Sequence, residues 1–222
     1  IYELALIYEL RKQDVMILQL FNTSLRLAAL GLKLLLTLYM GKYLGLSEMG
    51  TYGLVAASVA ISIPLLGFRL DYIVLREIVD KTEREYVPIL RDEFIFYLIN
   101  YVVVGAMVLL FVSSYGIEAD KKIIFYAMGL AMLESFATIT STCIGSLKRP
   151  ILSNFLFFVR SASWTIPAML LGFFYPEYRS AEVVFGFWLT GVLVSLAFTA
   201  FVWRKLPWRE SLQVPVNWPW IY

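Results

Sequence analysis

Long apolar stretches constrain the fold of this 222-residue chain more than any other feature of its sequence. A transmembrane helix needs about 20 consecutive, mostly apolar residues, and six stretches meet this requirement. They are residues 22–44, 50–70, 94–116, 123–147, 151–174 and 181–203. Transmembrane β-strands alternate apolar and polar residues over about ten positions, and these evenly apolar runs do not. The sequence therefore predicts an all-α integral membrane protein with six transmembrane helices.

The composition agrees with a membrane protein and argues against an enzyme. Hydrophobic residues make up 60% of the chain and charged residues 16%, whereas soluble domains have about 45–50% and about 25%. There is no His and only one Cys, Cys143, so the commonest zinc ligand is missing and no internal disulfide can form. No HExxH, GxSxG, P-loop or GxGxxG pattern occurs. We expect no catalytic residues, no metal, no cofactor and no nucleic-acid partner.

The chain divides into three parts. Residues 1–15 repeat the motif IYEL, and we expect either an extension foreign to the native protein or an amphipathic helix at the membrane interface. Residues 16–206 form the six-helix transmembrane lobe, and residues 207–222 form an interfacial tail rich in Pro and Trp. Most linkers are short, which predicts antiparallel neighbours. The exception, residues 76–93, is long and charged enough for a short surface helix.

Lys and Arg are distributed unequally between the two sets of linkers. One set carries Arg11, Lys12, Arg76, Lys81, Arg84, Arg91, Lys148, Arg149, Arg204, Lys205 and Arg209. The other set carries Lys42, Lys121, Lys122 and Arg179. Because cytoplasmic loops carry the excess of positive charge, we expect a multi-pass protein of the cytoplasmic (inner) membrane with both termini in the cytoplasm.

The first span contains two cations, Arg26 and Lys33. Seven residues separate them, so they lie about 20° apart around the helix, and Asn22 and Thr37 extend the same stripe. A charge at the centre of a bilayer costs roughly 2.5–3.5 kcal/mol on insertion scales, which favours a cavity filled with water or ligand. The alternative is that the side chains reach the headgroups, which is easier for Arg26 than for the more central Lys33.

Polar residues also interrupt spans four and five. Glu134 is the only acid deep in a predicted span, and Thr138 follows it at helical spacing. We expect Glu134 either to pair with a buried cation or to bind a proton or coupling cation. In span five, Asn154 and Ser161 share a face, and Arg160 lies beside them.

Three interior cations therefore face one carboxylate. This balance favours an anionic ligand such as a phosphate or pyrophosphate headgroup, since Arg and Lys both bind phosphate. The candidate substrate-binding residues are Arg26, Lys33, Arg160, Asn22 and Asn154, and the candidate coupling residue is Glu134.

Small residues and prolines predict how the helices pack. Pro64 in span two and Pro167 in span five predict kinks. Gly186, Thr190, Gly191 and Ser195 in span six suit close helix packing.

One segment of the chain resembles a known family. LRLAALGLKLLLTLYMGKYLGLSEMGTYGLVAASVAISIPLLGFRLDYIVLREI (25–78) is similar to the start of the polysaccharide-transporter branch of the MATE-like (MOP) superfamily, the O-antigen and exopolysaccharide flippases. The similarity is strongest in the turn GKYLGLSEMGTY (41–52), and LDYIVLREI (70–78) resembles the family's end of span two. Spans three to six match only in length, topology and a cytoplasmic turn like KRP (148–150).

This resemblance implies a fold of two lobes, each of about six helices, around a central cavity. It implies alternating access that moves an undecaprenyl-phosphate-linked oligosaccharide to the outer leaflet, with Arg26 where the family holds the lipid phosphate. The chain supplies one lobe, so we expect a second lobe or a homo-oligomer, with membrane lipids as further partners. Two other functions stay open: a MATE-type drug or metabolite exporter, and a non-transporting membrane subunit of a polysaccharide assembly complex.

Overall fold

The computed structural model describes the backbone of residues 2–68, 70–114, 121–147 and 149–216, and the side chains from residue 16 onward within these ranges, except those of residues 17 and 121. Helices make up most of these ranges, and no strand occurs in them. Within the described residues, six helical segments are long and apolar enough to cross a membrane. The predicted class, an all-α multi-pass membrane protein, is therefore confirmed.

The helices largely overlap the predicted spans, but the first and the third begin well before them. The spans are α1 (Tyr2–Tyr43), α2 (Leu46–Gly67), α4 (Glu83–Ser114), α5 (Lys121–Ser146), the composite of α6 (Pro150–Phe158), η1 (Val159–Ser163) and α7 (Thr165–Phe174), and α8 (Ala181–Trp203). Short helices complete the described chain: α3 (Leu70–Ile78), η2 (Pro176–Tyr178) and α9 (Trp208–Ser211). Helix α1 continues through residues 2–15, and the nature of that segment stays a prediction.

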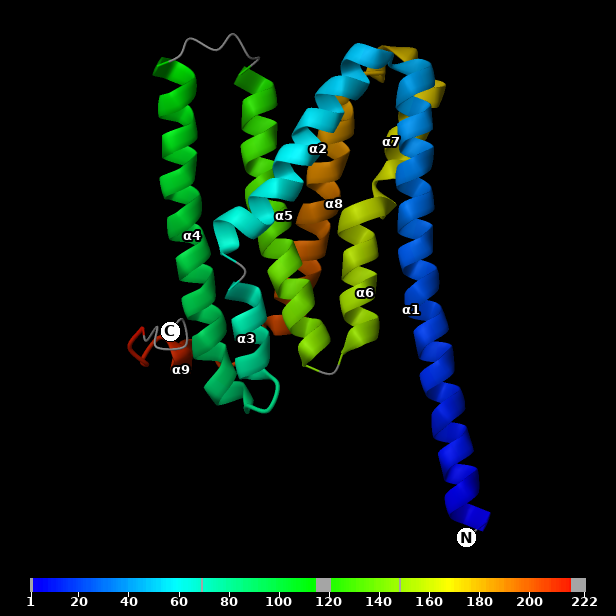
Figure 1. Ribbon diagram of the computed structural model, residues 1–222, viewed down its shortest axis with the longest axis vertical. Coiled ribbons are helices and arrows are strands. Elements are labelled where there is room, and N and C mark those ends of the chain that lie inside the picture. Colours follow the sequence, from blue (N-terminus) through cyan, green and yellow to red (C-terminus); the bar gives the residue numbers. More distant parts are fainter. Residues whose placement is uncertain (1, 69, 115–120, 148, 217–222) are drawn as a thin grey trace.

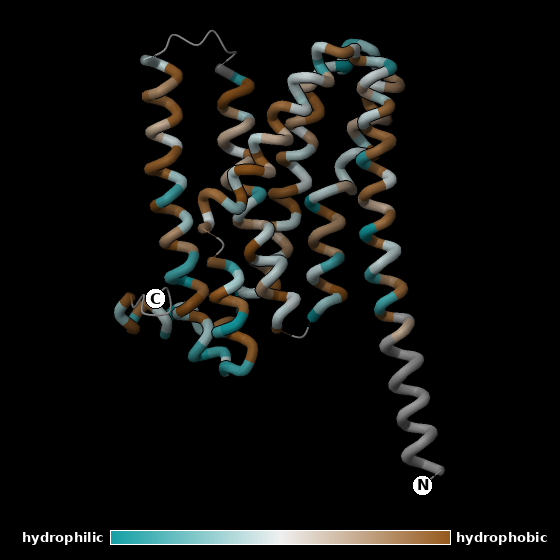
Figure 2. The backbone as a smooth tube through the Cα atoms, viewed as in Figure 1, coloured by the Kyte–Doolittle hydropathy of each residue, from teal (hydrophilic) through white to brown (hydrophobic). Residues whose placement is uncertain are grey.

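The spans form a bundle with α1 at one edge and α4 at the other (Figure 1). Helix α5 lies centrally and packs against α2, α6 and α8, while α1 packs against α6, η1, α7 and α2. Helix α4 presents a nearly continuous apolar surface over 102–111 (Figure 2). Such a surface suits contact with lipid, because exposed apolar area has no cost in an acyl environment.

Polar contacts fix which turns share an end of the bundle. The backbone N–H of Ala181 donates to Glu48 Oε2 over 2.6 Å, which joins the α1–α2 turn to the start of α8. At the opposite end, Arg84 Nε lies 3.2 Å from Glu210 Oε2, which joins the start of α4 to α9. Successive spans are therefore antiparallel, as the short linkers predict.

The prediction of a surface helix within residues 76–93 is wrong in position. Helix α2 ends at Phe68, whose φ of 46° is left-handed, and the short helix that follows is α3. Helix α4 already begins at Glu83, because the Thr82 N–H and hydroxyl both donate to Glu85 Oε2 over 2.8 Å. This is a capping-box contact that starts a helix. Residues 83–93 thus belong to the third spanning helix.

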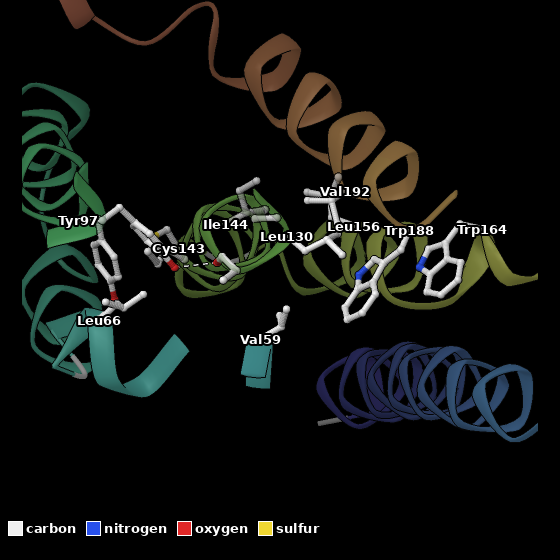
Figure 3. Close-up of a cluster of buried hydrophobic side chains, with 14 of the residues drawn as sticks. Val59, Leu66, Tyr97, Leu130, Cys143, Ile144, Leu156, Trp164, Trp188 and Val192 are labelled. Atoms are coloured by element: carbon white, nitrogen blue, oxygen red, sulfur yellow. Dashed lines mark hydrogen bonds between the residues drawn. The ribbon is translucent and has the colours of Figure 1, made fainter. Parts of the chain in front are cut away.

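The buried core contains a close contact between span five and α8 (Figure 3). The rings of Trp164 and Trp188 stack with their centroids 5.7 Å apart. A Cβ at Gly191 would lie 2.6 Å from Trp164 Cδ1, so only glycine fits there. The predicted packing role is confirmed for Gly191 and for the buried Ser195. The predicted packing role is wrong for two residues. A Cβ added at Gly186 would meet open space, and Thr190 is exposed.

Candidate functional site

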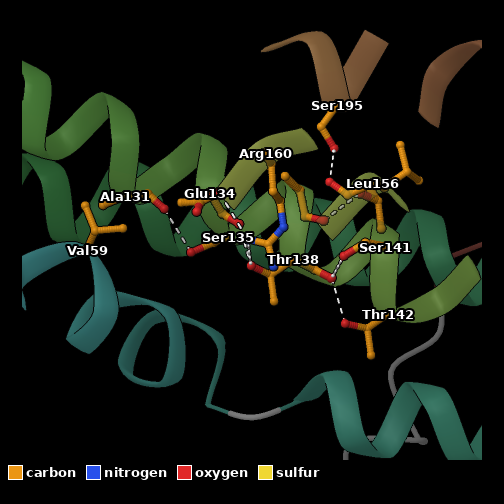
Figure 4. Close-up of polar contacts among 12 residues, drawn as sticks. Val59, Ala131, Glu134, Ser135, Thr138, Ser141, Thr142, Leu156, Arg160 and Ser195 are labelled. Carbon is orange, nitrogen blue, oxygen red and sulfur yellow. Dashed lines mark hydrogen bonds and ion pairs between the residues drawn. The ribbon is translucent and has the colours of Figure 1, made fainter. Parts of the chain in front are cut away.

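A buried ion pair joins α5 to span five (Figure 4). Arg160 Nη1 lies 3.1 Å from Glu134 Oε2, and the two side chains are 9% and 8% exposed. The same Nη1 donates to Thr138 Oγ1 over 2.9 Å. Of the two roles predicted for Glu134, the structure thus shows the pairing with a buried cation.

The irregular helix η1 carries Arg160 into this position. Pro167 has no N–H, and its ring clashes with the carbonyl four residues earlier, which belongs to Ser163. The chain accommodates this with the π-helical turn Val159–Ser163, a widened geometry that is common at functional sites. The irregularity predicted at Pro167 therefore occurs in the turn before it. Pro64 lies inside the helix α2, and the kink predicted there stays a prediction.

Two polar atoms beside the ion pair are left without hydrogen bonds to the described residues. They are Arg160 Nε and Ser161 Oγ, and both are buried. The Arg160 carbonyl is occupied, because it accepts from Trp164 Nε1 over 3.0 Å. The guanidinium thus keeps unused donor capacity inside the bundle, on the helical turn that departs from regular geometry.

The hydroxyl side chains of Thr138, Ser141 and Thr142 form a stripe on α5, and their hydrogen bonds are made mostly to backbone carbonyls of the same helix. Ser141 and Thr142 both donate to the carbonyl of Thr138, over 2.9 and 2.7 Å. Ser153 of α6 donates to the Ser141 carbonyl over 2.6 Å, which ties the two helices together. These contacts indicate a packing role for the stripe, apart from Thr138, which also binds Arg160.

A second polar contact links α1 to α6. Arg26 Nε donates to Asn154 Oδ1 over 3.2 Å, and Asn154 Nδ2 donates to the Pro150 carbonyl over 3.0 Å. The rest of the Arg26 side chain is exposed. One turn earlier, Asn22 Oδ1 is buried and accepts no hydrogen bond from a described residue. The Arg26 guanidinium is therefore oriented by Asn154, and no hydrogen bond joins its Nη groups to a described residue.

Lys33 is exposed although it lies deep in a spanning helix. Its charge interacts with those of Glu134 and Arg160, but its ammonium forms no hydrogen bond with any residue that the structure describes. The packed face of α1 is marked by the buried Leu36 and Met40, and Lys33 lies within about 60° of both. Lys33 therefore lies at the edge of the packed face of α1.

An open groove runs beside the Arg26–Asn154 contact, between α1 and α6. Its volume is about 510 Å³. It is lined by Leu18, Phe21, Arg149, Pro150, Ile151, Leu152 and Phe155. All of these are apolar except Arg149, so the groove combines an apolar wall with one cation.

The structure brings the predicted site residues together in two groups. Arg26, Asn154 and the neighbouring Asn22 form one group, while Arg160 and Glu134 form the other, with Lys33 as the charge between them. The two groups do not converge on one described cavity, and neither Lys33 nor Arg160 lines the groove.

Sequence reasoning missed a third charged cluster, at the start of α4. Arg91 Nη1 donates to the carbonyls of Ser211 and Val214, the latter over 2.8 Å, and Arg91 Nε donates to Asp92 Oδ1 over 2.7 Å. Glu93 is fully buried, and neither of its oxygens has a hydrogen-bond partner among the described residues. Three consecutive helical residues cover about 200°. If the helix of span three begins before these residues, at least one of the three charged side chains of Arg91–Glu93 must therefore face its neighbours. This run directly before an apolar stretch is the sequence signal that could have indicated the cluster.

Comparison with known proteins finds no family model, no curated protein and no solved structure that matches this chain. The family resemblance of residues 25–78 therefore stays a prediction.

Proposed function

We propose that this protein flips a lipid-linked oligosaccharide across the cytoplasmic membrane by alternating access, for polysaccharide biosynthesis. The observation that carries the proposal is the pair of exposed cations on α1, Arg26 and Lys33, together with the apolar groove beside the Arg26–Asn154 contact. The substrate class is an undecaprenyl-phosphate-linked oligosaccharide, which combines an apolar chain, an anionic phosphate and a polar sugar.

The exposed charges on α1 have a free-energy cost in the membrane. An ammonium that faces acyl chains at mid-membrane is unfavourable by roughly 2.5–3.5 kcal/mol, and Lys33 has no hydrogen-bond partner within the described chain. A phosphate that reaches Lys33 would remove this cost through a charge-assisted contact. Arg26 is already aimed by Asn154, which leaves its Nη groups available for a phosphate oxygen.

The groove between α1 and α6 is the second feature that supports the proposal. Its apolar wall suits a polyprenyl chain, and Arg149 supplies a cation at the same place. Arg149 and Arg26 would meet the phosphate first, and Lys33 lies two turns, about 10 Å, beyond Arg26 along the helix. These three residues suggest an order in which a headgroup passes along α1.

The third feature that supports the proposal is the unequal charge of the two ends of the bundle. The end of the bundle that carries α3, α9 and Arg149 also carries the larger set of Lys and Arg, and we place it in the cytoplasm by the positive-inside rule. We infer that a second six-helix lobe or a second copy of this chain faces the polar side of α1. Such a partner would close a cavity around Arg26 and Lys33.

The experiment is a flipping assay with the native full-length protein in lipid vesicles. A short-chain polyprenyl-pyrophosphate oligosaccharide with a fluorescent label is incorporated in both leaflets, and a membrane-impermeant reagent then quenches the outer leaflet. We expect quenching beyond the outer-leaflet fraction only in vesicles that contain the protein. Quenching equal to that of protein-free vesicles, with correctly folded protein, would exclude the flippase.

A second candidate function is a non-transporting membrane subunit of a polysaccharide assembly complex. The specific observation in its favour is that Arg160 is held in a buried pair with Glu134, which serves packing without any ligand. The drug-exporter alternative has less support, since the exposed charges on α1 are cationic and would repel a cationic drug. The flipping assay separates the first two candidates, because a subunit without transport activity leaves the inner leaflet protected.

A further inference from the structure

Glu93 is the most isolated ionisable group in the described part of the molecule. Its side chain has no exposed area, and both carboxylate oxygens lack a hydrogen-bond partner among the described residues. The residue lies in α4, where this helix packs against α2, α3, α5 and α9. A buried carboxylate without a partner is strongly disfavoured in its charged form.

The groups on its own helix do not neutralise Glu93. The Arg91 guanidinium is turned toward Asp92 and the carbonyls of Ser211 and Val214. Tyr97, one turn further along α4, is also buried and interacts with Glu93 electrostatically.

The neighbouring helices add negative or neutral groups at this position. Asp71 of α3 repels a charge on Glu93, and the buried Cys143 of α5 interacts with both acids. The other ionisable side chains of these helices lie elsewhere or are already paired. On α2 they are Glu48 and Tyr52; on α3, Tyr72, Arg76 and Glu77; on α5, Lys122, Tyr126 and Glu134; on α9, Arg209 and Glu210. Arg69 and the side chain of Lys121 lie outside the described residues.

The surroundings favour a proton over a metal ion as the species that Glu93 binds. No group of three or more acidic, Cys or His side chains able to hold a metal ion occurs among the described residues. No cation among the described residues pairs with Glu93, and a buried carboxyl group without a cationic partner is stabilised by taking up a proton. The proton comes from water: the carboxylate gains H⁺ and becomes a neutral carboxylic acid, with no change in any other bond.

We propose that Glu93 is a proton-binding site whose occupancy holds the end of α2 and helix α3 packed against α4 and α5. Tyr97 reaches from α4 toward the end of α2, with Cys143 beside it (Figure 3). Its hydroxyl occupies the space that a side chain at Gly67 would need. Ionised Glu93 would draw water into this contact and separate α3 from α4, so proton release and opening of this end of the bundle are one event. This inference goes beyond the proposed transport function and does not depend on it.

The first test is an infrared measurement of protonated carboxyl groups in the purified protein in lipid. We expect the wild type to show a carboxylic-acid C=O band at neutral pH that disappears on alkalinisation, and Glu93→Gln to lack this component. Glu77→Gln is the matched control, since Glu77 is an exposed acid of α3 that pairs with Lys81, and it should keep the band. Absence of the band from the wild type, or its persistence in Glu93→Gln, would overturn the proposal.

The second test uses Cys143, the only cysteine of the chain, which is buried beside Glu93. The rate of maleimide labelling is measured from mildly acidic to alkaline pH and divided by the rate for the same protein unfolded in detergent, which corrects for thiol ionisation. We expect the corrected rate of the wild type and of Glu77→Gln to exceed that of Glu93→Gln by about tenfold or more at alkaline pH. A ratio that stays constant across the pH range would overturn the proposed link between ionisation and opening.

Discussion

Arg160 Nη1 lies 3.1 Å from Glu134 Oε2, and this contact joins the π-helical turn of span five to the central helix α5. Both side chains are buried, so each charge depends on the other for stabilisation. Replacing a whole buried pair by neutral groups is often tolerated, whereas removing one member leaves an uncompensated charge. The pair therefore predicts a specific pattern of mutational effects.

We expect Arg160→Gln to destabilise the protein by about 3–5 kcal/mol, because Glu134 would remain buried without its cation. The double variant Glu134→Gln with Arg160→Gln should recover part of this loss. The measurement is the free energy of unfolding in mixed micelles. Arg84→Gln is the control, since its pair with Glu210 is 80% and 60% exposed and should contribute under about 1 kcal/mol. A double variant less stable than Arg160→Gln would contradict a charge-compensating pair.

We expect Gly191→Ala to cost about 1–3 kcal/mol of unfolding free energy, because the new methyl group would overlap Trp164. Gly186→Ala, on the same helix α8, should be neutral or stabilising by up to about 1 kcal/mol, since alanine is the better helix former and open space surrounds the position. Thermal unfolding of both variants in one detergent gives the comparison. Equal midpoints for the two would show that the contact between α8 and span five is looser than described.

We expect residue 84 to face the cytoplasm and residue 121 to face the opposite side of the membrane. Arg84→Cys and Lys121→Cys are made in a Cys143→Ala background and treated in intact cells with a membrane-impermeant thiol reagent. Labelling of position 121 and protection of position 84 is the predicted result, because the basic end of the bundle should stay inside. The reverse pattern would show an inverted topology.

The number and place of the spans could be predicted from the sequence because hydropathy acts over some twenty residues at a time. The start of span three could not be predicted in this way. The contact between Thr82 and Glu85 starts α4 within a charged linker. The start of the helix is thus set by this capping contact, whereas hydropathy marks only where the apolar stretch begins. In span five, Pro167 indicated an irregular helix, but the π-helical form and its position at Val159–Ser163 depend on packing between helices.

The candidate site could be predicted in part. Helical spacing places Arg26 and Lys33 on one stripe. The cost of a lone carboxylate inside a membrane span predicts a cationic partner for Glu134 as one of its two possible roles. The sequence did not decide which cation pairs with it, because that depends on how spans four and five cross. The sequence places Glu93 at the end of the charged linker 76–93, and its burial follows from the early start of α4 and the packing of α2, α3, α5 and α9 around that helix.

The most direct test of the account is substitution of the α1 cations in the native full-length protein, scored as surface polysaccharide at matched expression. We expect Arg26→Ala and Lys33→Ala each to reduce export by about 10- to 100-fold, since a hydrogen bond to a charged group contributes about 1.5–3 kcal/mol. Arg26→Lys should retain only part of the activity, because lysine lacks the fork that Asn154 orients. Lys42→Ala, at the far end of the same helix, should export normally. Full export by both Arg26→Ala and Lys33→Ala would contradict the claim that α1 lines a path for a lipid-linked phosphate.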